Sequence, residues 1–214
     1  GASDTNAALK EYLERHYNYK PHFMFLNCIE PHENYPIRDR ETVQDKWLYL
    51  SGILEMDEYV IRKLHNAYLK RLSYLDKQIG KAIGLLRKNG MLDDASLIIT
   101  SDHGQFFGEH NLLYHSLYPY AEVNKVPLII SKFKDGKIVS DYNVIEEPTS
   151  LMDLHGIILS IAGSKRSYRK SPVISEHNSI SEGWDGMLLS ALSRRSKYAA
   201  MIYKAKLSYN SKAY

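Results

Sequence analysis

The sequence has a single cysteine, Cys28, among its 214 residues. One cysteine excludes a disulfide framework within the chain, and it is too few for a zinc site built from thiolates. Long hydrophobic runs are also absent, since the longest apolar stretches (97–100, 127–130 and 156–161) fall far short of the roughly 18 residues that a membrane-spanning helix needs. No basic segment followed by an apolar one marks a signal peptide at the start.

A strong excess of charge of one sign is absent as well. The chain has 28 Lys and Arg against 25 Asp and Glu, a net charge of +3, which is too small an excess to indicate binding to nucleic acid or to a membrane surface. Hydrophobic residues make up 44% and charged residues 25%, as in ordinary globular proteins. We expect a soluble protein, with a cytoplasmic location and a prokaryotic origin favoured by composition.

Helical and strand-like patterns alternate along the chain. Apolar residues three and four positions apart predict a long amphipathic helix over 57–88, which Asn89-Gly90 ends. Shorter helices are expected over 3–17 and 148–161, with one helical turn near 120–124. Continuous apolar runs typical of buried strands occupy residues 22–28, 96–101, 126–131 and 172–175.

This alternation predicts an α/β fold with a doubly wound, mostly parallel sheet flanked by helices. After about residue 183 the pattern changes to alternating polar and apolar pieces, such as residues 197–203. We therefore expect an α/β domain over 1–182 and the start of a small antiparallel C-terminal subdomain over 183–214.

Two of the expected strands run directly into polar residues that can bind metals. The strand at 22–28 leads to Glu30-Pro31-His32, and the strand at 96–101 leads to Asp102-His103. In open parallel sheets, ligands bind outside the carboxyl ends of the strands. Asp102 and His103 offer a carboxylate oxygen and an imidazole nitrogen, although two such groups cannot hold a divalent cation alone. The alternative is an ordinary turn, in which Asp102 bonds to the backbone and Gly104 has a positive φ.

The eleven-residue segment 105–115 contains two more histidines, His110 and His115. Loops of that length without structure of their own are usually functional. Since His32, His103 and His115 all lie at or after strand ends, a functional role is favoured for them. Four other histidines are interpreted as ordinary surface or core residues, namely His22, His65, His155 and His177. Cys28 is interpreted as a small buried apolar residue.

These pieces together resemble the sulfatase family, within the alkaline-phosphatase-like superfamily. The resemblance is carried by Glu30-Pro31-His32, by Ser101-Asp102-His103-Gly104 with Gly108-Glu109-His110 downstream, and by the strand 126–130. It implies that Asp102 and His103 are ligands of a divalent metal, usually calcium, with manganese, magnesium or zinc as alternatives. It also implies that His32 contacts the sulfate and assists the leaving oxygen. His115 stands where the family has a Lys or His that binds the sulfate.

The sequence departs from the family in two respects. Family members carry a pair of aspartates after an N-terminal strand, and then Cys-x-Pro-Ser-Arg, whose cysteine becomes the formylglycine nucleophile. Neither occurs here, because the pair Asp93-Asp94 precedes a strand, and Cys28 is followed by Ile-Glu-Pro. We therefore expect an inactive fragment of a sulfuric ester hydrolase, whose formylglycine lies in a missing N-terminal part and which self-associates through the surface that truncation exposes.

The class of substrate stays open between a small sulfate ester and a small phosphate ester. The alternatives to a sulfatase are a phosphatase, phosphodiesterase or phosphonate hydrolase of the same superfamily. A non-catalytic binding module that keeps the fold is a further alternative. No nucleic-acid or membrane partner is expected under any of these interpretations.

Overall fold

The computed structural model describes residues 1–16, 21–32, 57–115, 119–165 and 170–173. The described residues belong to two compact units. Unit 1 draws them from 1–30, 73–104 and 124–176, and unit 2 draws them from 31–72 and 105–123. The C-terminal subdomain expected over 183–214 lies outside the described residues.

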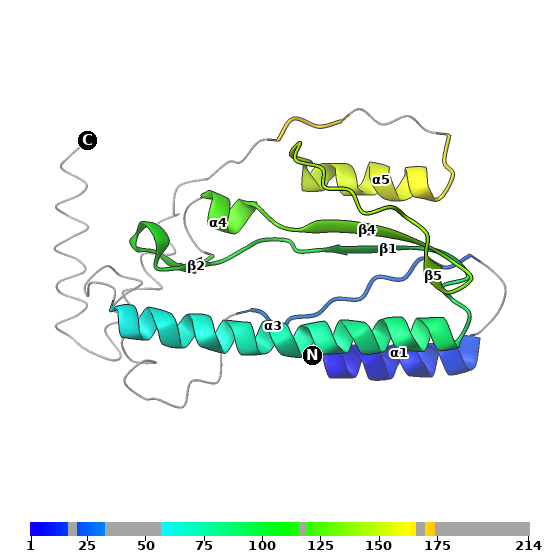
Figure 1. The fold of residues 1–214 in the computed structure, drawn as a ribbon, viewed down its shortest axis with the longest axis horizontal. Coiled ribbons are helices and arrows are strands. Elements are labelled where there is room, and N and C mark those ends of the chain that lie inside the picture. The colour runs from blue at the N-terminus through cyan, green and yellow to red at the C-terminus, as the bar shows by residue number, and fades with distance from the viewer. Residues whose placement is uncertain (17–20, 33–56, 116–118, 166–169, 174–214) are drawn as a thin grey trace, which may run out of the picture. The chain divides into compact units, whose positions relative to one another are not determined.

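Two helices form the main core of unit 1. The first, α1 (Ala2–His16), lies beside the second half of α3 (Glu58–Lys88), as Figure 1 shows. Apolar side chains four residues apart place one stripe of each helix at this contact. The core residues are Leu9, Leu13, Ala82, Leu86, Leu92 and Phe133.

The long helix ends where its sequence predicts. Gly90 has a φ of 68°, and the N–H of Met91 donates to the carbonyl oxygen of Leu86 at 2.9 Å. This is the Schellman arrangement, which satisfies carbonyl groups at the end of a helix. The observed bounds of α1 and α3 confirm the helices expected over 3–17 and 57–88.

The sheet of unit 1 has the order β1-β4-β5, and both of its pairings are antiparallel. It comprises β1 (Asp94–Thr100), β4 (Leu128–Lys134) and β5 (Lys137–Ile138). Asp135 and Gly136 join the last two strands, with φ of 48° and 71°, as a two-residue type I′ hairpin turn requires. Figure 1 shows α5 (Leu154–Ile161) on the opposite side of the strands from α1.

The parallel arrangement expected for residues 96–101 and 126–131 is wrong for these described strands, since Ile98 stands opposite Ile130 in an antiparallel ladder. Parallel neighbours need a crossover connection of a dozen or more residues, usually a helix. In the described residues of the connection between β1 and β4, 101–115 and 119–127, the regular elements are a two-stranded hairpin with a 3-10 turn at its tip and the short α4 (Ala121–Asn124), and none of these is a crossover helix.

The buried strand expected over 22–28 is also wrong, because residues 21–29 have no regular secondary structure. Among the described residues no strand pairs with this segment. Met24 packs against the core of unit 1, whereas Phe23 and Phe25 are 73% and 80% exposed. An apolar run becomes a central strand only where neighbouring strands satisfy its backbone and cover both of its faces.

The region expected to be a helix over 148–161 forms two short helices, η2 (Leu151–Asp153) and α5. The Ser150 hydroxyl accepts a hydrogen bond from the N–H of Met152 at 3.2 Å, which caps the first of them. The strand expected at 172–175 is not formed in its described residues, 172 and 173. Within the described part of the chain, no helix is both long and apolar enough to cross a membrane.

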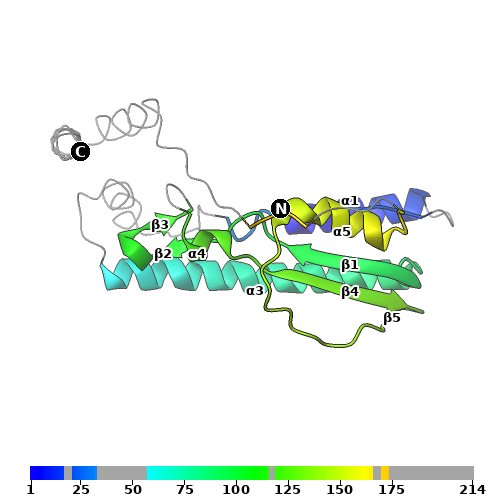
Figure 2. The same ribbon diagram turned by 90° about the horizontal axis from the view of Figure 1, so that it is seen from above.

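The regular elements in the described part of unit 2 are the first half of α3, a small hairpin and most of α4. The hairpin pairs β2 (Phe106–Phe107) with β3 (Leu113–Tyr114), and η1 (Glu109–Asn111) forms its tip. Figure 2 shows it beside α3. The residues that bury this contact are Val60, Leu64, Leu113 and Tyr114, with Phe107 partly buried against them.

Candidate active site

The first pair of expected site residues lies in unit 1, directly after β1. The Ser101 hydroxyl donates to the carbonyl oxygen of His103 at 2.8 Å, and the N–H of His103 donates to Asp102 Oδ1 at 3.0 Å. Asp102 therefore bonds to the backbone, as the turn interpretation expects. Gly104, however, is not among the described residues that have a positive φ.

A backbone carbonyl orients the imidazole of His103. Its Nδ1 lies 2.9 Å from the carbonyl oxygen of Gly104. Since a carbonyl oxygen only accepts hydrogen bonds, Nδ1 carries the proton and donates it. Nε2 is then the nitrogen with the lone pair in the neutral ring, which is the form of histidine that binds metals.

The same nitrogen lies near the Asp102 carboxylate. His103 Nε2 is 3.9 Å from Asp102 Oδ2. Two atoms that bind one cation at about 2.3 Å can stand no further than about 4.6 Å apart, so this spacing fits two ligands of a single ion. The Asp102 side chain is 87% exposed, which leaves its oxygens accessible.

The pKa of the Asp102 carboxyl lies below its ordinary value. Partial burial acts to raise this pKa, but the neighbouring His103 and hydrogen bonds from the backbone and from the Ser101 hydroxyl outweigh that effect. The carboxylate is therefore negatively charged at neutral pH, which is the form that binds a cation.

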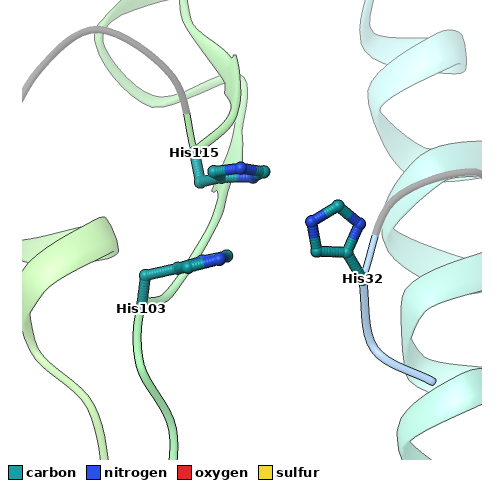
Figure 3. A group of neighbouring side chains, drawn as sticks. All are labelled: His32, His103 and His115. Carbon is teal, nitrogen blue, oxygen red and sulfur yellow. The ribbon is translucent and has the colours of Figure 1, made fainter. Parts of the chain in front are cut away.

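The second pair of expected site residues lies in unit 2. The rings of His32 and His115 approach edge to face, with centroids 5.1 Å apart and planes at 62°. Each offers a ring nitrogen, and these nitrogens lie within 4.8 Å of each other. Figure 3 shows His32 on the segment that precedes α3 and His115 directly after β3. Two imidazoles at this spacing can contact one anion or one cation.

The structure thus groups the four expected residues as one pair in each unit. Sequence reasoning missed a further cluster in unit 2, in which His110 stacks on Tyr120 and contacts Glu122. Only His110 had a sequence signal, as a histidine in a long segment after a strand. Tyr120 and Glu122 come after the hairpin in the sequence, and no helical or strand periodicity predicts that they contact His110.

An open groove in unit 1 contains none of the expected site residues. Lys170 Nζ donates to Glu147 Oε1 at 2.6 Å across it, so these two charges compensate each other. Since no imidazole or exposed carboxylate pair faces it, we do not assign it to the site. Its lining consists of Glu147, Pro148, Lys170, Ser171, Pro172 and Val173.

One family match spans the stretch of the chain in which all four expected residues lie. A family model described as Sulfatase matches residues 3–164. The chain is 31% identical over 107 residues to choline-sulfatase of Rhizobium meliloti (strain 1021), which covers 49% of this chain and 21% of that protein. It is 24% identical over 201 residues to an arylsulfatase of Clostridium perfringens (strain 13 / Type A), covering 79% of this chain and 40% of that protein.

A further relative has a broader description. The multifunctional alkaline phosphatase superfamily protein PehA of Trinickia caryophylli is 36% identical over 75 residues, which cover 35% of this chain and 14% of that protein. The chain thus spans between 14% and 40% of the length of these three relatives.

Proposed function

This chain belongs to the sulfatase family, and from that premise we propose that it supplies part of the active site of a metal-dependent sulfuric ester hydrolase. The observation that carries the proposal is the geometry after β1, where Asp102 Oδ2 and His103 Nε2 are 3.9 Å apart. The names of its relatives, choline-sulfatase and arylsulfatase, support an anionic sulfate ester as the substrate.

In this proposal Asp102 and His103 are ligands of a divalent cation. Asp102 contributes charge and an oxygen ligand. His103 contributes Nε2, because the Gly104 carbonyl holds the proton on Nδ1. When bound, a divalent cation supplies electrostatic polarisation of the ester oxygens. Imidazole is a better ligand for zinc than for calcium, so the histidine in this pair supports keeping zinc among the alternatives to calcium.

His32 and His115 act on the ester in the same proposal. One imidazole donates a hydrogen bond to the charged oxygens of the sulfate, and the other transfers a proton to the leaving oxygen. We assign the proton transfer to His32 and the anion contact to His115. The ring centroids are 5.1 Å apart, so both imidazoles can reach one ester group, and the division of roles between them follows the family resemblance.

We further propose that the chain alone does not turn over sulfate esters, because the sequence contains no Cys-x-Pro-Ser-Arg segment. Turnover of an aryl sulfate by the purified chain, lost in Asp102→Ala, would contradict this. A phosphate ester or phosphonate is the second candidate substrate, favoured by the likeness to an alkaline phosphatase superfamily protein. Peptide mass spectrometry of a longer native protein would separate the two, since formylglycine indicates sulfate chemistry and serine or threonine at that place indicates phosphoryl transfer.

Calorimetric titration of the chain with Mn²⁺, Zn²⁺ and Ca²⁺ tests the metal site directly. We expect Asp102→Asn to weaken binding by at least about tenfold, because it removes a charged ligand without changing the shape of the side chain. Asp141→Asn is the matched control, since Asp141 is also exposed and lies outside the proposed site. Equal metal affinity in the two variants would remove Asp102 from the proposed site, and absence of binding even in a longer native protein that carries the remaining ligands would support the binding-module alternative instead.

A further inference from the structure

The hairpin that leads to His115 has an unusual backbone at two bulky residues. His110 has φ 55° and ψ 20°, and Tyr114, directly before His115, has a φ of 67°. Side chains with a Cβ disfavour this left-handed region, so the surrounding structure must stabilise it. Such conformations cluster at functional sites, which prompts the question of what holds them here.

The His110 ring is held on three sides. It lies nearly parallel to the Tyr120 ring, with centroids 4.0 Å apart and planes at 18°. Its Nε2 is 3.3 Å from Glu122 Oε1. It also meets the Phe106 ring edge to face at a centroid distance of 6.2 Å, and Phe106 is fully buried. The ring is therefore fixed between the base of the hairpin and the segment that follows it.

Glu122 ties the same two parts of the chain together through its backbone. Its carbonyl oxygen accepts a hydrogen bond from the N–H of Gln105 at 2.9 Å, at the point where the hairpin begins. Its other carboxylate oxygen, Oε2, is buried and has no hydrogen-bond partner among the described residues. The contact of Oε1 with His110 therefore offsets part of the free-energy cost of burying this carboxylate.

We propose that His110 is a positioning residue for His115, acting through a clamp formed by His110, Tyr120 and Glu122. The clamp holds His110, at the tip of the hairpin, against the residues that follow the hairpin, and the hydrogen bond from Gln105 to Glu122 holds the base of the hairpin to the same residues. Phe106 pairs with Tyr114, so the backbone directly before His115 is fixed, which restricts the directions that the His115 ring can take before any ligand arrives. The value of this restriction to catalysis depends on the proposed role of His115 as an anion contact.

The test is the NMR resonance of the His115 ring in the full 214-residue chain, assigned by its loss in His115→Asn. His110→Asn removes the ring of the clamp but tolerates the left-handed backbone, since Asn adopts it readily. We expect the His115 resonance to move and to broaden in this variant while the rest of the spectrum stays folded. His155→Asn is the matched control, because His155 is exposed on α5, and it should leave the resonance unchanged.

Glu122→Gln provides a second variant of nearly identical shape, which should move the His115 resonance in the same direction. An unchanged His115 resonance in both folded variants would overturn the clamp. The proposed function is tested separately by adding inorganic sulfate to the unaltered chain, which should shift the His115 ring. If sulfate leaves that ring unaffected while His110→Asn displaces it, the clamp holds and the anion role of His115 is wrong.

Discussion

Nδ1 of His103 lies 2.9 Å from the carbonyl oxygen of Gly104, its neighbour in sequence. The contact fixes which nitrogen of the ring carries the proton, and therefore which one is available to a metal. It is a local contact, so it depends on the conformation of two adjacent residues only. The tautomer of His103, on which the proposed metal binding depends, is set by the turn itself before any ligand is present.

The tautomer of His103 can be measured directly. In the neutral ring we expect Nδ1 to be protonated and Nε2 to be the unprotonated nitrogen, because only a donor can face the Gly104 carbonyl. Long-range ¹H–¹⁵N correlation spectra, recorded above the pH at which the ring loses its charge, distinguish the two forms. Finding the proton on Nε2 would show that the Gly104 contact does not govern the ring.

Acid should weaken the fold slightly through Asp102. Its pKa is lowered in the folded chain, so it contributes stability above the pKa of the unfolded chain and loses that contribution as pH falls through the lower, folded value. In Asp102→Asn, the loss of melting temperature between neutral pH and pH 3 should be smaller than in the unaltered chain. The difference will be small, because the side chain is largely exposed and solvent screens it. A larger acid sensitivity in the variant would reverse the assigned direction.

The core of the hairpin is expected to depend on Phe106. It is 0% exposed, so Phe106→Ala should reduce the free energy of unfolding by about 3–5 kcal/mol. Phe25 is 80% exposed, and Phe25→Ala should change it by no more than about 0.5 kcal/mol. Urea denaturation of the two variants compares the same substitution at a buried and an exposed site. Similar losses in both would mean that Phe25 is covered in solution.

Gly108 should not tolerate a side chain. It has a φ of 109°, and a Cβ there would lie 2.6 Å from Ile61 Cδ1 on α3. We expect the backbone strain in Gly108→Ala to destabilise the protein by about 1–3 kcal/mol, before any cost of the contact with Ile61 is added. Gly80, in the interior of α3, has no atom within 4 Å of the position that an alanine Cβ would take, and Gly80→Ala should instead stabilise the helix by about 0.5–1 kcal/mol. Thermal melting should therefore move in opposite directions for the two variants.

Local features could be predicted from the sequence because their causes are local. Apolar spacing over 57–88 predicted α3, and Asn89-Gly90 predicted its end, since both depend on residues within a few turns of each other. The direction of β1 relative to β4 could not be predicted in this way. An apolar run has the same appearance in a parallel and an antiparallel sheet, and the direction depends on the connection between the strands.

The candidate site shows the same division. Asp102 and His103 follow a strand in the sequence, so their proximity could be predicted from chain order. The approach of His32 to His115 joins residues far apart in the sequence. Their positions after expected strands marked both as functional, but only the family resemblance gave both a role at the same sulfate. The contact of Glu122 with His110 had no signal, because a glutamate after a short loop is ordinary in composition and becomes informative only when the hairpin places an imidazole beside it.

The tight turn at Asp135-Gly136 has a consequence for the order in which the chain folds. Strands joined by two residues lose little chain entropy on pairing, and such hairpins form within about 1–10 μs. β1 must close a much longer loop to reach β4, which delays its pairing. We therefore expect the β4–β5 hairpin, which includes Phe133, to form before β1 pairs with β4, and the Asp102-His103 turn to become ordered only after that pairing.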